Sequence, residues 1–266
     1  MSEQHLTTQY FCGCAGGIPS APVDLTLTEG GAEVGTQGNA DFPKHWNPKE
    51  LNTLVRLSKH DAEFKEVDRD FRASLLEGFS RQYHMTKFQR TYHGSYANGG
   101  YRNIHKDPLH FETVGVLRAQ YPIKWQKLAL EKKDIALNFN GEEAMEITVY
   151  HGTSKDYALK IPGTGFSRYM TSTPGYGSGV YADPHGQISI HHALSAGTSN
   201  KGHILVCKLV YHKFGRTVGG DTRPPNGTDC GACCAPTDEF PIPCILVSYR
   251  DDQLLVTHVI EIEWKR

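Results

Sequence analysis

The sequence lacks the features that mark membrane-spanning and secreted proteins. No apolar run approaches the roughly 20 residues that a membrane-spanning helix needs, and the N-terminus lacks the charged-then-apolar pattern of a secretory signal. The formal net charge is -1 over 266 residues, so charge points neither to a nucleic acid nor to a membrane surface. We therefore expect a soluble intracellular protein of the cytoplasm or nucleus, a monomer without membrane or nucleic-acid partners.

The cysteines cannot form a complete set of intrachain disulfides, because seven is an odd number. Six of them have spacings that could ligate zinc: Cys230, Cys233, Cys234 and Cys244, with the distant Cys12 and Cys14. Strong zinc motifs pair two compact ligand clusters, whereas the second cluster here lies near the N-terminus. We predict reduced thiols and no metal, with a zinc site as the alternative.

Composition predicts an N-terminal leader followed by a folded domain. Residues 1–41 are rich in Gly, Thr, Ala and Pro and show no sustained period of 2 or 3.6, which is typical of a flexible segment. From Phe42 the composition changes, and Trp46 between Pro43 and Pro48 predicts an anchored turn. We assign residues 42–266 to the folded domain.

Two helices are predicted in the first half of this domain. Over residues 61–79, apolar side chains recur at spacings of three and four, as on one face of a helix that ends near Gly78. These side chains are Phe64, Val67, Phe71 and Leu75. A second helix follows Pro122 and turns Trp125, Leu128 and Ile135 inward. Between the helices, residues 85–91 alternate like a strand, and residues 92–109 read as a long loop.

The second half of the domain is richer in strands. Short apolar or β-prone runs at 180–181, 203–210, 245–249 and 256–262 each predict a strand. Strands and helices do not alternate regularly along the chain. The pattern therefore favours an α+β fold with mainly antiparallel sheets over a doubly wound fold.

The stretch from Val149 to His192 carries the residues that best suit a flat polar ligand. His151 could hydrogen-bond a ribose hydroxyl through one ring nitrogen while the protein fixes the other. Gly152 has no side chain to block its amide and carbonyl, which could bind a carboxamide. Ser189 could give that carboxamide a third hydrogen bond. The alternatives are a core histidine at His151 and a helix-initiating serine at Ser189.

A glycine-rich turn precedes Tyr181 in this stretch. Glycines at 175, 177 and 179 allow tight backbone geometry, so the tyrosine ring can be held rigidly as a stacking wall. The simpler interpretation is a strand aromatic that only packs.

Together, these segments resemble the catalytic domain of the poly(ADP-ribose) polymerase-like ADP-ribosyltransferases. The resemblance is carried by Val149–Thr153, by the glycine run that ends at Tyr181, and by residues 245–253 near the C-terminus. Polymerising members of the family have a glutamate at the position of Ile245, so the sequence is most similar to the mono-ADP-ribosylating, His-Tyr-Ile branch. The likeness covers about residues 42–266, although the loop at 92–109 is longer than the family leads us to expect.

The resemblance implies an ADP-ribosyltransferase fold, with two packed, mainly antiparallel β-sheets and flanking helices. It implies an enzyme that uses NAD+ as co-substrate, transfers a single ADP-ribose to protein side chains and releases nicotinamide. The catalytic positions of the family are then taken by His151, Tyr181 and Ile245. The NAD-binding positions are taken by His151, Gly152, Thr153, Tyr181, Ser189 and His192.

The sequence also departs from the family in ways that keep other functions open. His192 falls where a second stacking tyrosine is usual, and its smaller, titratable ring covers less area. Ile245 can neither bind a hydroxyl nor accept a proton, and a carboxylate from another segment, Glu239, is the alternative. A catalytically silent module that binds NAD or ADP-ribose is one other function. An NAD-dependent RNA 2'-phosphotransferase is another, but it would require basic residues for its RNA.

Overall fold

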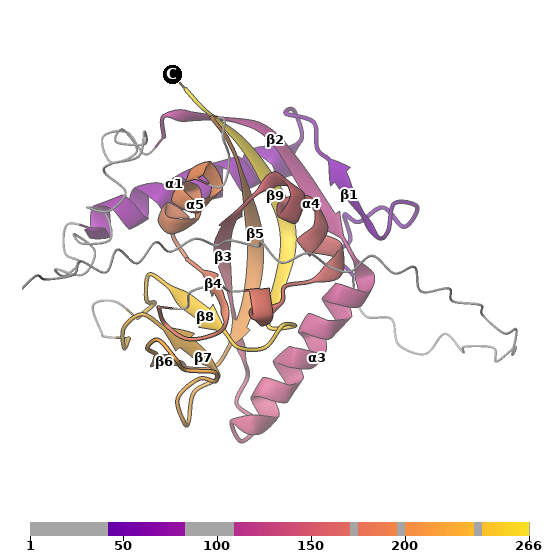
Figure 1. Ribbon diagram of the computed structural model, residues 1–266. Helices are drawn as coiled ribbons and strands as arrows, with labels where there is room; N and C mark the ends of the chain where they lie inside the picture. Colours follow the sequence, from indigo (N-terminus) through magenta and orange to yellow (C-terminus); the bar gives the residue numbers. More distant parts are fainter. Residues whose placement is uncertain (1–41, 83–108, 171–174, 196–199, 237–240, 266) are drawn as a thin grey trace, which may run out of the picture.

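The computed structural model describes residues 42–82, 109–170, 175–195, 200–236 and 241–265 (Figure 1). These residues form two β-sheets with flanking helices, so the predicted α+β class is confirmed. The predicted leader at 1–41 and the predicted strand at 85–91 lie outside the described residues, as does all of the 92–109 loop except its last residue.

The larger sheet has five strands in the order β1-β2-β9-β5-β3, and every neighbouring pair is antiparallel. Its strands are β1 (Thr53–Arg56), β2 (Phe111–Gln120), β3 (Met145–Thr153), β5 (Lys201–Tyr211) and β9 (Leu254–Trp264). The strands predicted at 203–210 and 256–262 are the inner parts of β5 and β9. Strand β5 is a nearly continuous apolar run because both of its faces are covered: Leu205 and Val206 point to opposite faces, and both are buried.

The smaller sheet has four strands in the order β4-β8-β7-β6. Its strands are β4 (Val180–Ala182), β6 (Phe214–Arg216), β7 (Cys230–Ala232) and β8 (Leu246–Ser248). The pairs β4–β8 and β7–β8 are antiparallel, whereas β6 and β7 are parallel. The prediction of mainly antiparallel sheets is therefore confirmed. In Figure 1 this sheet lies at the lower left, beside one end of the larger sheet.

Helices α1 (Ala62–Gln82) and α5 (Gln187–Ser195) pack together against one face of the larger sheet. Their buried side chains include Phe71 and Ile190, which meet Tyr150 of β3 in one hydrophobic cluster. Figure 1 shows the two helices side by side at the upper left. This packing places α5 directly over the end of β3.

The opposite face of the larger sheet is covered by α4 (Lys155–Thr164) and by the smaller sheet. Ala158 of α4, Val180 of β4 and Leu246 of β8 share a buried cluster with Val149 and Leu205 of the larger sheet. The same core therefore joins the two sheets and fixes β4 and β8 relative to β3. A short 3-10 helix, Arg168–Met170, follows α4.

The predicted apolar face of helix α1 is confirmed, but its predicted C-terminal end is wrong. Phe64, Phe71 and Leu75 are all buried. The helix continues past Gly78 to Gln82, so Gly78 does not terminate it. A Cβ atom at Gly78 would lie 2.7 Å from Cβ of His185 and 2.9 Å from the side chain of Gln187. Glycine is therefore required there by close packing against the start of α5.

Helix α3 (Pro122–Asn138) starts at the predicted proline and buries Leu128 and Ile135. Its Trp125 ring meets the ring of Trp46 edge-on, with centroids 5.8 Å apart. The predicted anchored turn around Trp46 is thus confirmed. No helix in the described part of the chain is long and apolar enough to cross a membrane.

Candidate functional site

The candidate site starts at the C-terminal end of β3, where one edge of the strand has no neighbouring strand of the larger sheet and Gly152 is buried. Tyr150 and Asp183 exchange two backbone hydrogen bonds there, of 2.8 Å and 3.0 Å. Because hydrogen-bonding directions alternate along an antiparallel strand, the N–H and C=O of Gly152 point to the same side as those of Tyr150, away from β5. Gly152 therefore offers one donor and one acceptor on this edge.

Gly152 is a glycine because α5 packs onto its backbone. A Cβ atom at Gly152 would lie 1.8 Å from the carbonyl oxygen of Ser189 and 2.8 Å from the backbone nitrogen of Ala193. No side chain fits in that space. The absence of a side chain at Gly152 therefore allows α5 to pack closely on β3. The N–H and C=O of Gly152 lie in the plane of the strand, along the edge that has no neighbouring strand.

The ring of His151 is fixed by the main chain of β4. Its Nδ1 lies 2.7 Å from the carbonyl oxygen of Tyr181. A carbonyl can only accept, so we assign the proton to Nδ1, which leaves Nε2 as an acceptor. Burial lowers the pKa of His151, and the Tyr181 carbonyl opposes this only in part. The ring is therefore neutral at pH 7. It also meets the ring of Phe166 edge-on, with the ring centroids 5.3 Å apart.

Hydrogen bonds hold both the side chain and the main chain of Tyr181. Its hydroxyl accepts a hydrogen bond from the N–H of Tyr176 at 2.7 Å and donates one to the carbonyl of Gly177 at 2.9 Å. Its ring lies 6.4 Å from that of Tyr176, centroid to centroid, and is half-buried. A ring restrained in this way is suited to act as a fixed wall rather than as a mobile side chain.

The glycine-rich turn is bound from the other side by Tyr249, whose hydroxyl donates to the carbonyl of Tyr176 at 3.0 Å. Gly177 has φ of +99°, and a Cβ atom there would lie 2.0 Å from the hydroxyl oxygen of Tyr249. Both the backbone conformation and the lack of space require glycine. The predicted tight turn is therefore confirmed, with Tyr249 as the partner that sequence reasoning did not identify.

Asp183 links β3, β4 and α5. Its backbone pairs with Tyr150, and its side chain accepts hydrogen bonds from the N–H of His185 at 3.0 Å and from the N–H and hydroxyl of Ser189 at 2.7 Å each. Burial raises the pKa of Asp183 to about 6, against the effect of these bonds. The group is therefore still ionised at pH 7, beside the N-terminus of α5, whose dipole favours a negative charge.

Ser189 lies in the first turn of α5, as the helix-initiating alternative proposed. It is buried, and both its N–H and its hydroxyl are directed at Asp183. Its carbonyl oxygen, in contrast, lies against Gly152. The structure thus places Ser189 next to the open edge, with its proton already donated.

His192 and Thr153 flank the same region. Burial, together with the neighbouring His151, lowers the pKa of His192 to about 4. The two imidazoles are therefore close enough to interact electrostatically. Thr153, the last residue of β3, is buried and pairs with His203 of β5. No hydrogen bond in the described part of the chain assigns Thr153 a role toward a ligand.

Ile245 immediately precedes β8 and is buried in a cluster that includes Val247 and Tyr249, against which Tyr181 packs. The fold therefore brings together Tyr181 and Ile245, which are 64 positions apart in the chain. The alternative carboxylate, Glu239, lies outside the described residues.

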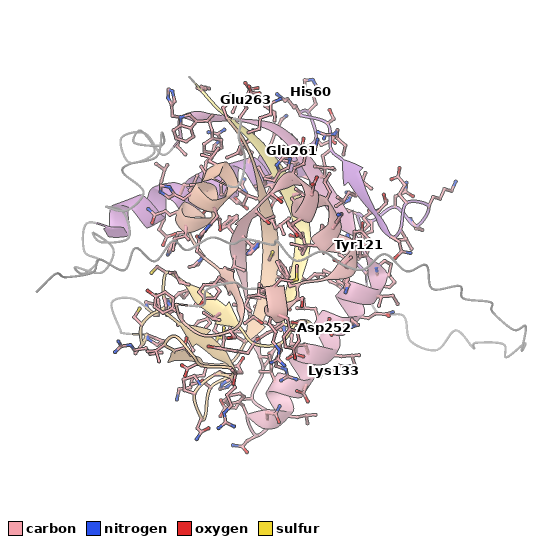
Figure 2. The ribbon with its side chains drawn as sticks, in the orientation of Figure 1. His60, Tyr121, Lys133, Asp252, Glu261 and Glu263 are labelled. Carbon is pink, nitrogen blue, oxygen red and sulfur yellow. The ribbon has the colours of Figure 1, made fainter. Side chains whose placement is uncertain are left out.

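The acidic and amide side chains of the turn after β8 are bound to other parts of the chain. Asp251 accepts from the N–H of Arg168 at 3.0 Å. Asp252, which is labelled in Figure 2, pairs with Lys127 of α3 at 3.0 Å. The buried Gln253 accepts a hydrogen bond from the hydroxyl of Ser248 at 2.9 Å.

Asp183 is the residue of this site that sequence reasoning missed. The signal was present, since an aspartate a few residues before a helix is a common cap for the helix N-terminus. Its second role, pairing with the backbone of Tyr150, depends on the tertiary approach of β4 to β3. Sequence patterns do not report such a contact.

Comparison with known proteins shows a distant similarity. The chain is 26% identical over 162 residues to a mouse (Mus musculus) protein named protein mono-ADP-ribosyltransferase PARP10. The match covers 55% of this chain and 16% of the mouse protein. No family model matches the sequence. The architecture of two antiparallel-rich sheets with flanking helices is compatible with the ADP-ribosyltransferase fold.

Proposed function

We propose that this protein transfers a single ADP-ribose from NAD+ to a protein side chain and releases nicotinamide. The observation that carries the proposal is the open backbone edge at Gly152, next to the neutral His151 ring and the strand that holds Tyr181. The distant similarity to a mono-ADP-ribosyltransferase supports it. We place the catalytic domain, of the ADP-ribosyltransferase fold, at residues 42–266 and treat residues 1–41 as a leader.

The edge at Gly152 is matched to a carboxamide. Its N–H donates to the carboxamide oxygen, and its C=O accepts from the carboxamide NH2, in the same pattern that joins residues of neighbouring antiparallel strands. A carboxylate in that position has no proton to give to the carbonyl. Gly152 therefore selects nicotinamide over nicotinate and orients the leaving group.

His151 and Tyr181 hold the rest of the nicotinamide nucleoside. Because Nδ1 of His151 donates to the Tyr181 carbonyl, Nε2 is the atom that accepts a hydrogen bond from a ribose hydroxyl. The Tyr181 ring stacks on nicotinamide, and it loses little freedom on binding because it is already restrained. Thr153, Ser189 and His192 complete the NAD-binding set, with Ser189 as an acceptor for the carboxamide NH2 and His192 as a neutral, smaller ring beside His151.

These contacts favour cleavage of the bond between ribose C1 and the nicotinamide nitrogen. The bonding electron pair leaves with nicotinamide, and the ribose passes through an oxocarbenium-like state that the acceptor attacks at C1. Residues that hold the leaving group in one orientation stabilise this arrangement relative to free NAD+. Ile245 supplies no proton acceptor. An acceptor with its own ionised oxygen, such as a glutamate or aspartate, needs none.

A module that binds NAD or ADP-ribose without turnover is the second candidate. It is favoured by one observation, the commitment of the Ser189 proton to Asp183, which leaves the hydroxyl unable to donate to a ligand. The two candidates differ in turnover, not in binding.

The test is incubation of the full chain with NAD+ labelled in its adenosine part, with and without candidate acceptor proteins. We expect nicotinamide release and stoichiometric transfer of label to protein. In the variant His151→Asn, the amide can still donate to the Tyr181 carbonyl but no acceptor stands at Nε2, so kcat/KM for NAD+ should fall by about 10- to 100-fold. The control His212→Ala changes a partly buried histidine that pairs with Glu142, and it should keep full activity.

Three outcomes separate the hypotheses. Release of nicotinamide that is sensitive to His151→Asn supports the transferase. Thermal stabilisation by NAD+ without release of nicotinamide identifies the binding module. Neither stabilisation nor release overturns both.

A further inference from the structure

Three cysteine thiols gather where β7 ends beside the start of β8. Cys233 directly follows β7, and Cys244 lies two positions before β8. The N–H of Cys233 donates to the carbonyl of Ile245 at 3.1 Å, which fixes the two chain segments next to each other. The Sγ atoms of Cys233 and Cys244 are 3.3 Å apart, and those of Cys233 and Cys234 are 3.8 Å apart.

The three thiols differ in their surroundings. Cys233 and Cys244 are half-buried and pack against the cluster of Ile245, Val247 and Tyr249, whereas Cys234 is exposed. The structure has no disulfide among these three cysteines. Cys230 is not part of this group, because it is fully buried and its Sγ contacts the carbonyl of Val247 at 3.3 Å.

We propose that Cys233 and Cys244 are a reversible disulfide site that exchanges with low-molecular-weight disulfides such as glutathione disulfide. The sulfur atoms must approach from 3.3 Å to the disulfide bond length of about 2.05 Å. They belong to residues 11 positions apart, in segments already joined by a backbone hydrogen bond. Little backbone movement is therefore needed.

The exchange balances in two steps. One protein thiolate attacks the small disulfide, forms a mixed disulfide and expels one small thiolate. The second protein thiolate then attacks the protein sulfur of that mixed disulfide and expels the other. Two protein thiols are oxidised, one small disulfide is reduced to two small thiols, and the two protein protons pass to those products.

Cys244 is a better partner for Cys233 than the adjacent Cys234. A disulfide between neighbouring residues closes a very small ring that strains the peptide bond between them.

The exchange should also be slow at neutral pH. The contact with Cys234 lowers the pKa of Cys233, but the contact with Cys244 and burial outweigh it and raise that pKa to about 12. Only a small fraction of Cys233 is then thiolate.

A metal site is the competing explanation for clustered thiols. Among the residues that the structure describes, no group of three or more His, Cys, Asp or Glu side chains is arranged to hold a metal ion. A disulfide needs only the pair of sulfur atoms that the fold already brings together.

The experiment equilibrates the full chain in glutathione buffers of increasing oxidised fraction, followed by acid quenching, alkylation and peptide mass spectrometry. We expect a Cys233–Cys244 linked peptide to appear with a defined midpoint and to disappear on return to reduced glutathione. The link should persist in the matched control Cys234→Ser and vanish in Cys244→Ser. In the unsubstituted chain and the control, oxidation should raise the melting temperature by roughly 5 °C, because the link restrains the unfolded chain.

Direct detection of the linked peptide in the unsubstituted chain does not depend on the folding of any variant. Absence of that peptide at every buffer ratio overturns the proposal. So does a link from Cys233 to Cys234 or to another cysteine in its place. One tightly bound zinc per purified chain that protects Cys233 and Cys244 from alkylation also overturns it and makes the cluster a metal site.

Discussion

The hydroxyl of Ser189 donates to Oδ2 of Asp183 at 2.7 Å, and the backbone N–H of Ser189 donates to the same oxygen at the same distance. The Asp183 carboxylate is ionised at pH 7 and has no proton to return. Ser189 can therefore offer a ligand only a lone pair. In our proposal it accepts from the carboxamide NH2 and does not donate to the carboxamide oxygen.

Substitution of Ser189 by alanine separates this binding role from a purely structural one. We expect Ser189→Ala to raise KM for NAD+ by about tenfold with little change in kcat, because one hydrogen bond to bound substrate is lost. The free energy of unfolding should fall by about 1 kcal/mol, since one buried hydrogen bond to Asp183 is also lost. Steady-state kinetics and urea unfolding measure the two effects. A lower stability with unchanged KM would show that Ser189 only organises the start of α5.

The stability of the protein should fall as the medium is acidified, and His192 should contribute to this. The pKa of His192 is about 4 in the folded chain and 6.5 in its ordinary state. Between these values the unfolded chain binds more protons, so stability is present above pH 6.5 and is lost as pH falls toward about 4. We expect His192→Gln to remove up to about 3 kcal/mol of that loss.

Asp183 changes the stability of the protein in the opposite direction over a similar pH range. Its pKa is about 6 in the folded chain against an ordinary value of 3.8, so the folded chain binds more protons between these values and gains stability as pH falls. The comparison of wild type with His192→Gln isolates the histidine, because Asp183 is present in both. Urea unfolding across this pH range provides the measurement, and parallel curves for the two proteins would contradict the assignment.

Gly152→Ala should damage the fold as well as the site. The new Cβ atom would lie 1.8 Å from the backbone oxygen of Ser189, a group that cannot move without displacing α5. We expect a loss of about 3 kcal/mol or more in the free energy of unfolding. The matched control is Gly163→Ala in α4, where the nearest atom is the edge of the Tyr121 ring at 3.0 Å. Equal stability of the two variants, measured by urea unfolding, would refute the close packing of α5 on β3.

The product should carry single ADP-ribose units. Elongation would require activation of a hydroxyl on an attached ADP-ribose, a weak nucleophile that needs a proton acceptor. Ile245 offers only apolar atoms to the cluster that contains Tyr181. Intact-mass spectra of modified acceptor after long incubation should show one addition per modified side chain. Ladders of linked ADP-ribose would refute this expectation.

Much of the scaffold could be predicted from sequence because its signals are local. The apolar positions of α1 and α3 recur at helical spacing, and both β5 and β9 contain long apolar runs. The candidate site was also predicted in part, since His151, Gly152 and Tyr181 lie in short motifs with recognisable chemistry. The motifs do not indicate that these residues lie around one strand end, because that arrangement depends on how the sheets pack.

The remaining features depend on contacts between distant segments. Gly78 looked like a helix end, but it is a point of close approach between α1 and the residues before α5. Asp183 was not singled out from the sequence, but it joins β3 to α5. The proximity of Cys233 and Cys244 arises from the pairing of β7 with β8. Periodicity and composition carry no record of such packing.

The position of β3 at the edge of the larger sheet bears on whether another strand can add to this sheet. Exposed strand edges are templates on which a second polypeptide can add a strand, and that addition draws its affinity from several successive backbone hydrogen bonds. Near the end of β3, the bridge to Asp183 occupies Tyr150, and α4 begins at Lys155. The opening around Gly152 is too short for another strand but long enough for one amide group. This part of the edge is therefore a poor template for a second strand, although its length suits a single amide group.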